Sequence, residues 1–166
     1  MKITVAGEGG QGVQVIAEIL AKAAFLDNKS SLYIPNFGVE QRGGVSLGFI
    51  VIDDKEVVYP KFEKTDILAV FCDRAIERTK RYISPGTKII LGPAVKSKKI
   101  SGIRLKTALA TKVWNMVILG KIISLQDLVS QESVEKAIEE RFARWFAKQP
   151  SLRELDFKAL AEGLKQ

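Results

Sequence analysis

The chain has 166 residues, of which 46% are apolar, and its 26 basic and 19 acidic residues give a net charge of +7. This length predicts a single domain, residues 1–166, with a substantial core, and the positive charge favours anionic partners. The chain contains no histidine and one cysteine, Cys72. This composition excludes an internal disulfide and an iron–sulfur cluster held by this chain's own cysteines. It also removes the commonest general base and the commonest metal ligand, so we expect no catalytic residue and no metal site.

The chain opens with a predicted strand, a glycine-rich turn and an amphipathic helix. Residues 2–6 are typical of a strand, and apolar residues at helical spacing predict a helix over residues 13–25. The turn between them has the spacing G-x-G-x-x-G, as at the start of a βαβ unit. Glycines there let the backbone turn sharply and let the N–H groups of the helix face an anion. The residues of this glycine turn are Gly7, Gly9, Gly10, Gln11 and Gly12.

The glycine turn alone leaves two interpretations open. A dinucleotide site also needs an acidic residue at the end of the second strand, where it holds a ribose hydroxyl. The second predicted strand, residues 31–34, continues into Pro35-Asn36 without an acid, and Asp27 lies in the turn before that strand. The turn is therefore compatible with an independent dinucleotide-binding module or reductase, or with close packing alone.

The rest of the chain alternates between predicted strands and helices. Residues 45–52 and 56–59, joined by a polar turn, predict an antiparallel hairpin. Further strands are predicted over residues 66–72, 87–91 and 102–105. Helices are predicted over residues 73–82 with Asp73 as N-cap, 107–123, from Ser130 or Ser133 to 146, and 151–164 with a capping box at Ser151 and Glu154. This order predicts an α/β fold, a three-layer sandwich with a mostly parallel sheet, an antiparallel hairpin and a helical C-terminus.

Two further motifs follow the glycine turn. Residues 35–44 have the sequence PNFGVEQRGG, and residues 115–120 have the sequence NMVILG. The three motifs, in this order, closely resemble the γ subunit of 2-oxoacid:ferredoxin oxidoreductases, and the resemblance extends from residue 2 to about residue 142. Val39 stands where the family often has proline, which would stiffen the loop. Besides the glycine turn, the positions that match the family are Pro35, Phe37, Gly38, Glu40, Arg42, Gly43, Gly44, Asn115 and Gly120.

The resemblance implies a non-catalytic γ subunit of a thiamine diphosphate-dependent complex. The complex converts a 2-oxoacid, coenzyme A and oxidised ferredoxin to acyl-CoA, carbon dioxide and reduced ferredoxin. Thiamine diphosphate, magnesium and the iron–sulfur clusters would belong to α, β and ferredoxin-like δ subunits or their fused equivalents. The γ subunit would shape the region of the active site and of coenzyme A, and it would be inactive alone. Residues 42–44 and 59–60 are more similar to members that act on larger 2-oxoacids.

Several of these residues have a functional and a structural interpretation. Arg42 is suited to a bidentate contact with a carboxylate or phosphate of a partner subunit or of coenzyme A. Alternatively, it pairs with Glu40 and shapes the loop. Gln11 is expected to brace residues 35–44 rather than to bind a nucleotide. Asn115 lies in an apolar helix, where its amide is expected to brace neighbouring backbone.

The distribution of charge bears on the partners and the location of the protein. The basic residues are scattered rather than gathered in one stripe, so we expect no nucleic-acid partner. No apolar run is long enough to span a bilayer, and Met1 leads directly into a strand, so we expect no membrane partner and a cytoplasmic location. The densest basic cluster is either a solvated loop or a contact for phosphate or an acidic protein. Its members are Lys96, Lys98, Lys99, Arg104 and Lys106.

Overall fold

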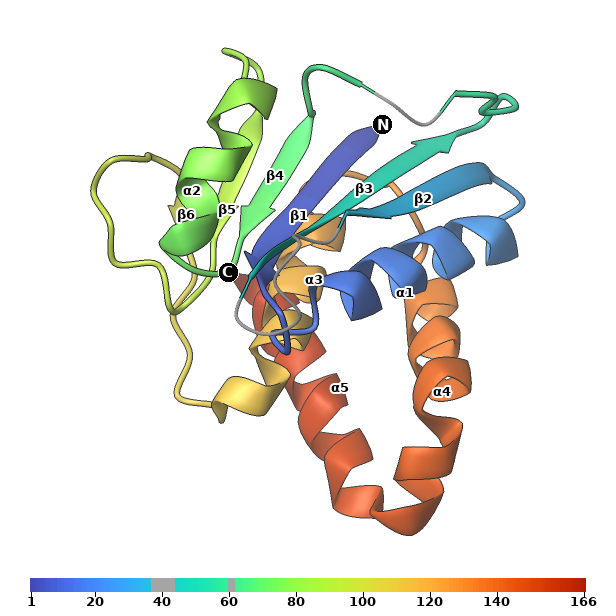
Figure 1. Ribbon diagram of the computed structural model, residues 1–166. Coiled ribbons are helices and arrows are strands. Elements are labelled where there is room, and N and C mark those ends of the chain that lie inside the picture. Colours follow the sequence, from blue (N-terminus) through green and yellow to red (C-terminus); the bar gives the residue numbers. More distant parts are fainter. Residues whose placement is uncertain (37–43, 60–61) are drawn as a thin grey trace.

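The protein is a six-stranded mixed sheet with helices on both faces (Figure 1). The computed structural model describes residues 1–36, 44–59 and 62–166. The strands are β1 (Lys2–Glu8), β2 (Ser30–Asn36), β3 (Val45–Asp53), β4 (Ile67–Val70), β5 (Lys88–Leu91) and β6 (Ile103–Arg104). The helices are α1 (Val13–Leu26), α2 (Arg74–Thr79), α3 (Trp114–Ser124), α4 (Gln131–Lys148) and α5 (Pro150–Lys165), with 3-10 turns η1 (Lys80–Tyr82) and η2 (Thr111–Val113).

The alternation of side chains along the strands divides the core into two layers. On β4, Ile67 and Ala69 belong to the layer beneath α1 and α3, whereas Leu68 and Val70 belong to the layer beneath α2. In Figure 1, α2 lies on one side of the sheet, and α1, α3, α4 and α5 lie on the other. The predicted three-layer α/β fold with a helical C-terminus is thereby confirmed.

The sheet differs from the expectation in the position of its antiparallel hairpin. The strand order is β2-β3-β1-β4-β5-β6, and β3 is antiparallel to both β1 and β2, whereas the other pairs are parallel. The hairpin is therefore β2–β3, and the prediction that residues 45–52 pair with residues 56–59 is wrong. Residues on both faces of β3 are buried, and the strand pairs with β1 on one side and with β2 on the other, whereas Val58 is 83% exposed.

The glycine Gly48 permits the central position of β3. A Cβ atom at this residue would lie 2.9 Å from Val5 Cγ2 and 3.1 Å from Ala17 Cβ, so α1 and β1 approach the bare backbone. Because β3 enters between β1 and β2, α1 connects two parallel strands that are not adjacent. The opening of the chain is thus a βαβ unit with one strand inserted.

The predicted helices are present, and Asp73 occupies the N-cap position of α2 as expected. Its side chain makes no capping hydrogen bond, and its Oδ1 accepts instead from Lys96 N at 3.0 Å and Ser97 N at 2.9 Å. The capping box at Ser151 and Glu154 is wrong, since α5 begins at Pro150. Proline suits the first helical position, where no N–H partner is required. Helical structure also begins at residue 111 rather than 107.

The helix α4 is held to α1 by polar contacts. The Ser130 hydroxyl caps α4 by accepting from Ser133 N at 3.1 Å, and the Asp27 carboxylate accepts from both serines. Burial acts to raise the pKa of Asp27, but these hydrogen bonds outweigh it and hold the pKa below its usual value. Arg141 also pairs with Glu18 at 2.8 Å across the two helices.

The helices α3 and α5 touch through glycine. A Cβ atom at Gly120 would lie 2.2 Å from the carbonyl oxygen of Leu160, and one at Gly163 would lie 2.0 Å from that of Val117. The two backbones therefore meet directly, which places α5 against the buried α3. Within the described ranges, no helix has the length and apolar character that crossing a membrane requires.

Candidate functional site

The three sequence motifs converge at one edge of the sheet. The parallel strands β1, β2, β4 and β5 all end at this edge, where ligands gather in open α/β sheets. The glycine turn follows β1 there, residue 36 ends β2, and residue 44 leads into β3 (Figure 1). The turn and both ends of the second motif are therefore neighbours.

The glycine turn is closed by Gln11. Its Oε1 accepts from Glu8 N at 2.8 Å, and its backbone N donates to Glu8 O at 3.1 Å. A Cβ atom at Gly7 would lie 2.7 Å from the same Oε1, so this glycine makes room for the side chain. The described hydrogen bonds of Gln11 thus brace its own turn.

Two contacts join the glycine turn to the other motifs. The backbone N of Gly9 donates to the carbonyl oxygen of Gly44 at 3.2 Å. Gly12 is the N-cap of α1 with φ +82°, and a Cβ atom there would lie 2.6 Å from Asn115 Nδ2. Gly10 also has a positive φ, +95°, but a Cβ atom at this position would meet open space. Gly12 is therefore required both by backbone conformation and by the approach of α3.

The third motif lies in α3. Asn115 is 9% exposed, and its Oδ1 is buried with no hydrogen-bond partner in the described part of the chain. A buried carbonyl oxygen without a hydrogen bond lowers the stability of the fold. The close packing of Asn115 against Gly12 is therefore accompanied by the loss of a hydrogen bond. Gly120, at the other end of the motif, lies where α3 crosses α5.

The second motif is described only at its ends. Pro35 lies in β2 opposite Gly48, and Gly44 accepts the hydrogen bond from Gly9. The remaining positions that matched the family lie outside the described residues, and their roles stay predictions. These positions are Phe37, Gly38, Glu40, Arg42 and Gly43.

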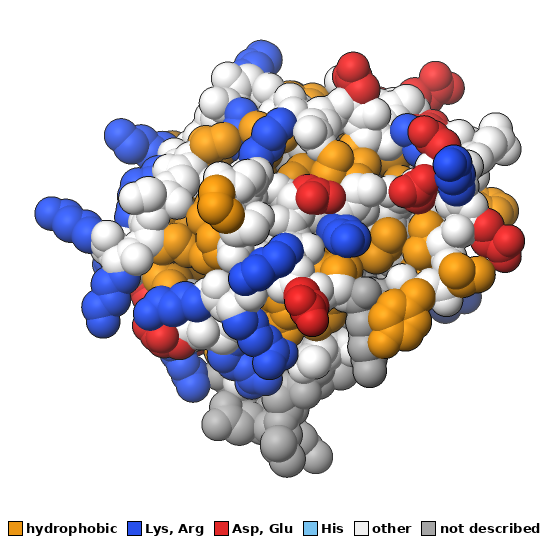
Figure 2. Space-filling view, turned by 90° about the horizontal axis from the view of Figure 1, so that it is seen from above, with side chains coloured by type: hydrophobic (Ala, Val, Ile, Leu, Met, Phe, Trp, Pro, Cys, Tyr) orange, Lys and Arg blue, Asp and Glu red, His pale blue; other side chains and the backbone are white. Residues whose placement is uncertain are grey.

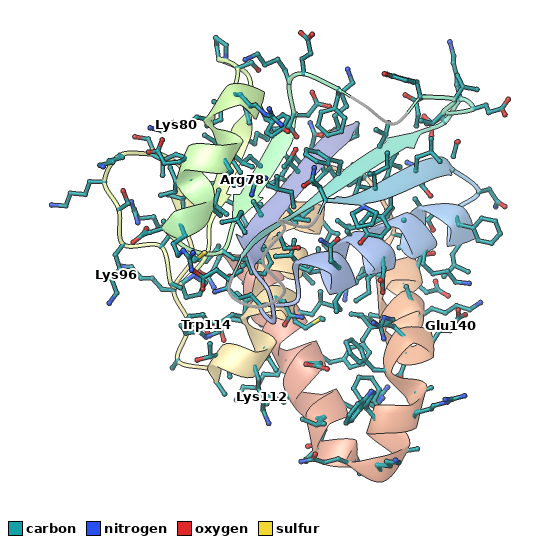
Figure 3. The ribbon with its side chains drawn as sticks, viewed as in Figure 1. Arg78, Lys80, Lys96, Lys112, Trp114 and Glu140 are labelled. Carbon is teal, nitrogen blue, oxygen red and sulfur yellow. The ribbon has the colours of Figure 1, made fainter. Side chains whose placement is uncertain are left out.

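A cavity of about 420 Å³ lies beside the glycine turn, between α3 and the α4–α5 hairpin. Its apolar lining includes Trp114, Phe142 and Trp145, and Trp145 is 64% exposed. Figure 3 shows Trp114 and Lys112 at the start of α3, beside α5. This cavity was not predicted from the sequence. The spacing of Phe142, Trp145 and Phe146 in α4 was the available signal, since it forms one aromatic stripe.

One acidic residue in this cavity has a shifted pKa. Burial raises the pKa of Asp156 to about 6, although the nearby positive charge of Lys112 acts in the opposite direction. Both residues line the cavity together with the glycine turn. Its polar wall thus combines an amide, a cation and a carboxyl group that changes protonation between pH 5 and 7.

A second cavity of about 710 Å³ lies on the other face of the sheet. The ring of Phe49 meets those of Phe62 and Tyr82 edge to face, with centroids 5.6 and 5.1 Å apart. The guanidinium of Arg81 lies 4.7 Å from the centre of the Tyr82 ring. Tyr59 lines the same cavity and is 67% exposed.

The described geometry does not favour a dinucleotide at the glycine turn. The strand β2 ends in Pro35 and Asn36, so within the described residues this strand does not end in a carboxylate that could hold a ribose. The N–H of Gly9 is already bonded to Gly44, and Asn115 lies against the helix N-terminus at Gly12. One N–H group of the turn is thus already bonded within this chain, and the side chain of Asn115 crowds the helix N-terminus.

Comparison with known proteins identifies the family. The family model described as pyruvate ferredoxin/flavodoxin oxidoreductase matches residues 2–166. The chain belongs to this family. The 2-oxoglutarate synthase subunit KorC of Methanocaldococcus jannaschii is 34% identical over 151 residues, covering 82% of this chain and 81% of the relative. The pyruvate synthase subunit PorC of Methanothermobacter thermautotrophicus is 37% identical over 152 residues, with 82% of each chain covered.

A solved structure supports the same assignment. The γ subunit of a keto/oxoacid ferredoxin oxidoreductase from Geobacter sulfurreducens superposes with a TM-score of 0.77 and 27% identity. The match covers 99% of this chain and 96% of that one. The resemblance to oxidoreductase γ subunits, inferred from the three motifs, is therefore confirmed.

Proposed function

We propose that this chain, residues 1–166 as one domain, is the non-catalytic γ subunit of a thiamine diphosphate-dependent 2-oxoacid:ferredoxin oxidoreductase complex. The complex would convert a 2-oxoacid, coenzyme A and oxidised ferredoxin to acyl-CoA, carbon dioxide and reduced ferredoxin in the cytoplasm. Membership of the family supports this proposal, as do relatives named as subunits of pyruvate synthase and 2-oxoglutarate synthase. Because these relatives are named for different 2-oxoacids at similar identity, we leave the substrate unassigned.

The chemistry of the chain supports a non-catalytic role. It has no histidine, and its one cysteine, Cys72, is 8% exposed. Burial raises the pKa of the Cys72 thiol, which disfavours the thiolate that a metal or a nucleophilic reaction needs. Thiamine diphosphate, magnesium and the iron–sulfur clusters would therefore be held by α, β and ferredoxin-like δ subunits or their fused equivalents.

The observation that carries the proposal is the convergence of the three motifs. Residue 36 is held in β2, and Gly44 is bonded to Gly9 of the glycine turn, so both ends of the second motif are anchored at the carboxyl edge. We infer that this edge faces the active-site region of the complex, and that Arg42 contacts coenzyme A or a partner subunit there. An arginine suits this task because its guanidinium binds phosphates and carboxylates through two parallel hydrogen bonds.

Substitution of Arg42 by alanine tests this function in the assembled complex. We expect Arg42→Ala to change the stability of the lone chain by no more than about 0.5 kcal/mol. Loss of a desolvated charged contact would weaken association by about 2–5 kcal/mol, with a corresponding fall in coenzyme A-dependent turnover. The measurements are urea unfolding of the lone chain, followed by assembly and turnover of the complex with several 2-oxoacids.

The matched control is Arg144→Ala, which removes an exposed arginine from α4. It should leave assembly and turnover unchanged. If Arg42→Ala unfolds the lone chain readily, Arg42 only shapes its own loop. If turnover is the same in both variants, the working surface lies elsewhere. A wild-type complex that oxidises no 2-oxoacid would contradict the function itself.

A further inference from the structure

The positive charge of the protein is concentrated in one part of the chain. Residues 73–112 contain eleven lysines or arginines and two acidic residues, a net charge of +9 against +7 for the whole chain. All eleven basic residues are exposed. Seven of them lie on α2, on η1 and in the loop that follows β5. The expectation of scattered charge is therefore corrected by the structure.

We define the basic face as five of these residues, on α2, η1 and the loop of residues 92–102. Figure 2 shows Lys and Arg side chains gathered on one side of the molecule, and Figure 3 shows the labelled Arg78, Lys80 and Lys96 on α2, η1 and the neighbouring loop. Lys80 pairs with Glu77 at 2.7 Å, whereas the other four make no ion pair in the described part of the chain. The members of the basic face are Arg78, Lys80, Lys96, Lys98 and Lys99.

The loop of the basic face is held in a defined position. The carboxylate of Asp73 accepts from the backbone N of Lys96 at 3.0 Å and of Ser97 at 2.9 Å, which ties the loop to the start of α2. The guanidinium of Arg104 donates to Val95 O at 2.8 Å and to Ser97 O. Asp73 and Arg104 thus hold the loop itself, which reduces the cost of ordering the loop backbone on binding.

The composition and position of the basic face favour a macromolecule over a small anion as its partner. Neither of the cavities described above is lined by residues of the basic face, so neither offers a small anion a concave site there. The large apolar side chains that are exposed lie elsewhere, which argues against insertion into a membrane. Lysine is depleted in the cores of protein interfaces, whereas the rims of interfaces are polar. A lysine-rich face therefore fits an acidic surface of another protein at the rim of their interface.

We propose that the basic face docks an acidic surface of another subunit of the same complex, and that it speeds the assembly of the complex. This inference rests on the proposed function, because that function requires partner subunits. Charges at the rim of an interface steer the approach of a partner and set the association rate more than the final affinity. The partner is thus recognised by its surface carboxylates.

Charge reversal tests the inference. The variant Lys96→Glu, Lys98→Glu and Lys99→Glu should associate with the other subunits about tenfold more slowly than wild type in about 50 mM salt. At about 500 mM salt the two rates should converge, because exposed charges are then screened within a few ångströms. Stopped-flow or surface-based measurement of association with the purified partner subunits gives both rates.

The control makes the same change of charge elsewhere on the molecule. The variant Lys136→Glu, Lys148→Glu and Lys158→Glu alters three exposed lysines of α4 and α5. Its association rate should stay within about twofold of wild type. Equal slowing of both variants would assign the effect to net charge and overturn the inference, as would unchanged assembly of the basic-face variant.

Two further outcomes separate the competing explanations. A DNA duplex of about 20 base pairs serves as a probe for nucleic acid, whose binding falls steeply with salt. Tight binding of this duplex by wild type, lost in the basic-face variant while assembly stays normal, would identify nucleic acid as the partner and overturn the inference. If wild type itself fails to assemble, the proposed function fails as well, whereas normal assembly of the variant overturns only the inference.

Discussion

Replacing Gly120 by alanine tests whether α3 and α5 depend on direct contact between their backbones. The added Cβ would lie 2.2 Å from the carbonyl oxygen of Leu160 and 2.9 Å from the backbone N of Leu164. Real Cβ atoms do not approach other atoms so closely, and backbone atoms cannot rotate away as a side chain would. The two helices must therefore move apart along their buried contact.

The size of the effect follows from two opposing contributions. Alanine favours a helix over glycine by about 1 kcal/mol. Overpacking a buried contact costs about 1–3 kcal/mol, and more where the backbone must shift, as here. We expect Gly120→Ala to lower the free energy of unfolding by about 2 kcal/mol, which corresponds to a fall of about 4–8 °C in Tm for a chain of this size.

Urea and thermal unfolding of the lone chain measure this effect, and Gly86 provides the control. A Cβ atom at Gly86 would meet nothing within 4 Å. Gly86→Ala should therefore be neutral, or stabilise by a few tenths of a kcal/mol through reduced freedom of the unfolded chain. Equal stability of the two variants would refute the backbone contact between α3 and α5.

Two further predictions concern the candidate site. Gly10→Ala and Gly12→Ala both place a side chain at positive φ, which should lower the free energy of unfolding by about 1–2 kcal/mol. Gly12→Ala should lower it by about 1 kcal/mol more, because its added Cβ also meets Asn115. Urea unfolding measures both, and the excess should shrink in an Asn115→Ala background, which removes the contacts with Nδ2 and Cγ but keeps Cβ. Burial raises the pKa of Asp156 from its ordinary value of 3.8 to about 6 in the folded state. The folded state therefore loses stability relative to the unfolded state as pH rises from about 4 to about 6. Asp156→Asn should be more stable than wild type by about 1 kcal/mol at pH 8, allowing for partial exposure, and equal near pH 4; a difference independent of pH would contradict this assignment.

The sequence predicted the elements of the fold better than their pairing. Apolar runs identified β1, β4 and β5, because buried parallel strands are nearly continuous in apolar residues. The predicted pairing of β3 with residues 56–59 was wrong, because a strand pattern shows which faces of a strand are buried but not which strand lies beside it. Val57 and Val58 are typical of a strand, yet residues 54–59 form none, and Val58 is 83% exposed.

The candidate site was predictable only in part for a similar reason. The glycine turn is a local feature, and its glycines at positive φ follow from the turn itself. The contact of Gly12 with Asn115 joins residues more than a hundred positions apart, which no local pattern reveals. The cavity beside them was missed because it forms only when α5 packs on α3 and brings Asp156 to Lys112.

The inserted position of β3 has a consequence for how the chain folds. The central strand β1 pairs with β3 and β4, residues 45–53 and 67–70, and in the described part of the chain no strand nearer in the sequence pairs with it. During synthesis β1 leaves the ribosome well before either partner strand, so Ile3 and Val5 stay in contact with solvent or chaperones until β3 and β4 have been made. Distant pairing slows folding and prolongs the exposure of an apolar, strand-forming segment. Aggregation of nascent chains should therefore begin at the strand that later becomes the most protected part of the sheet.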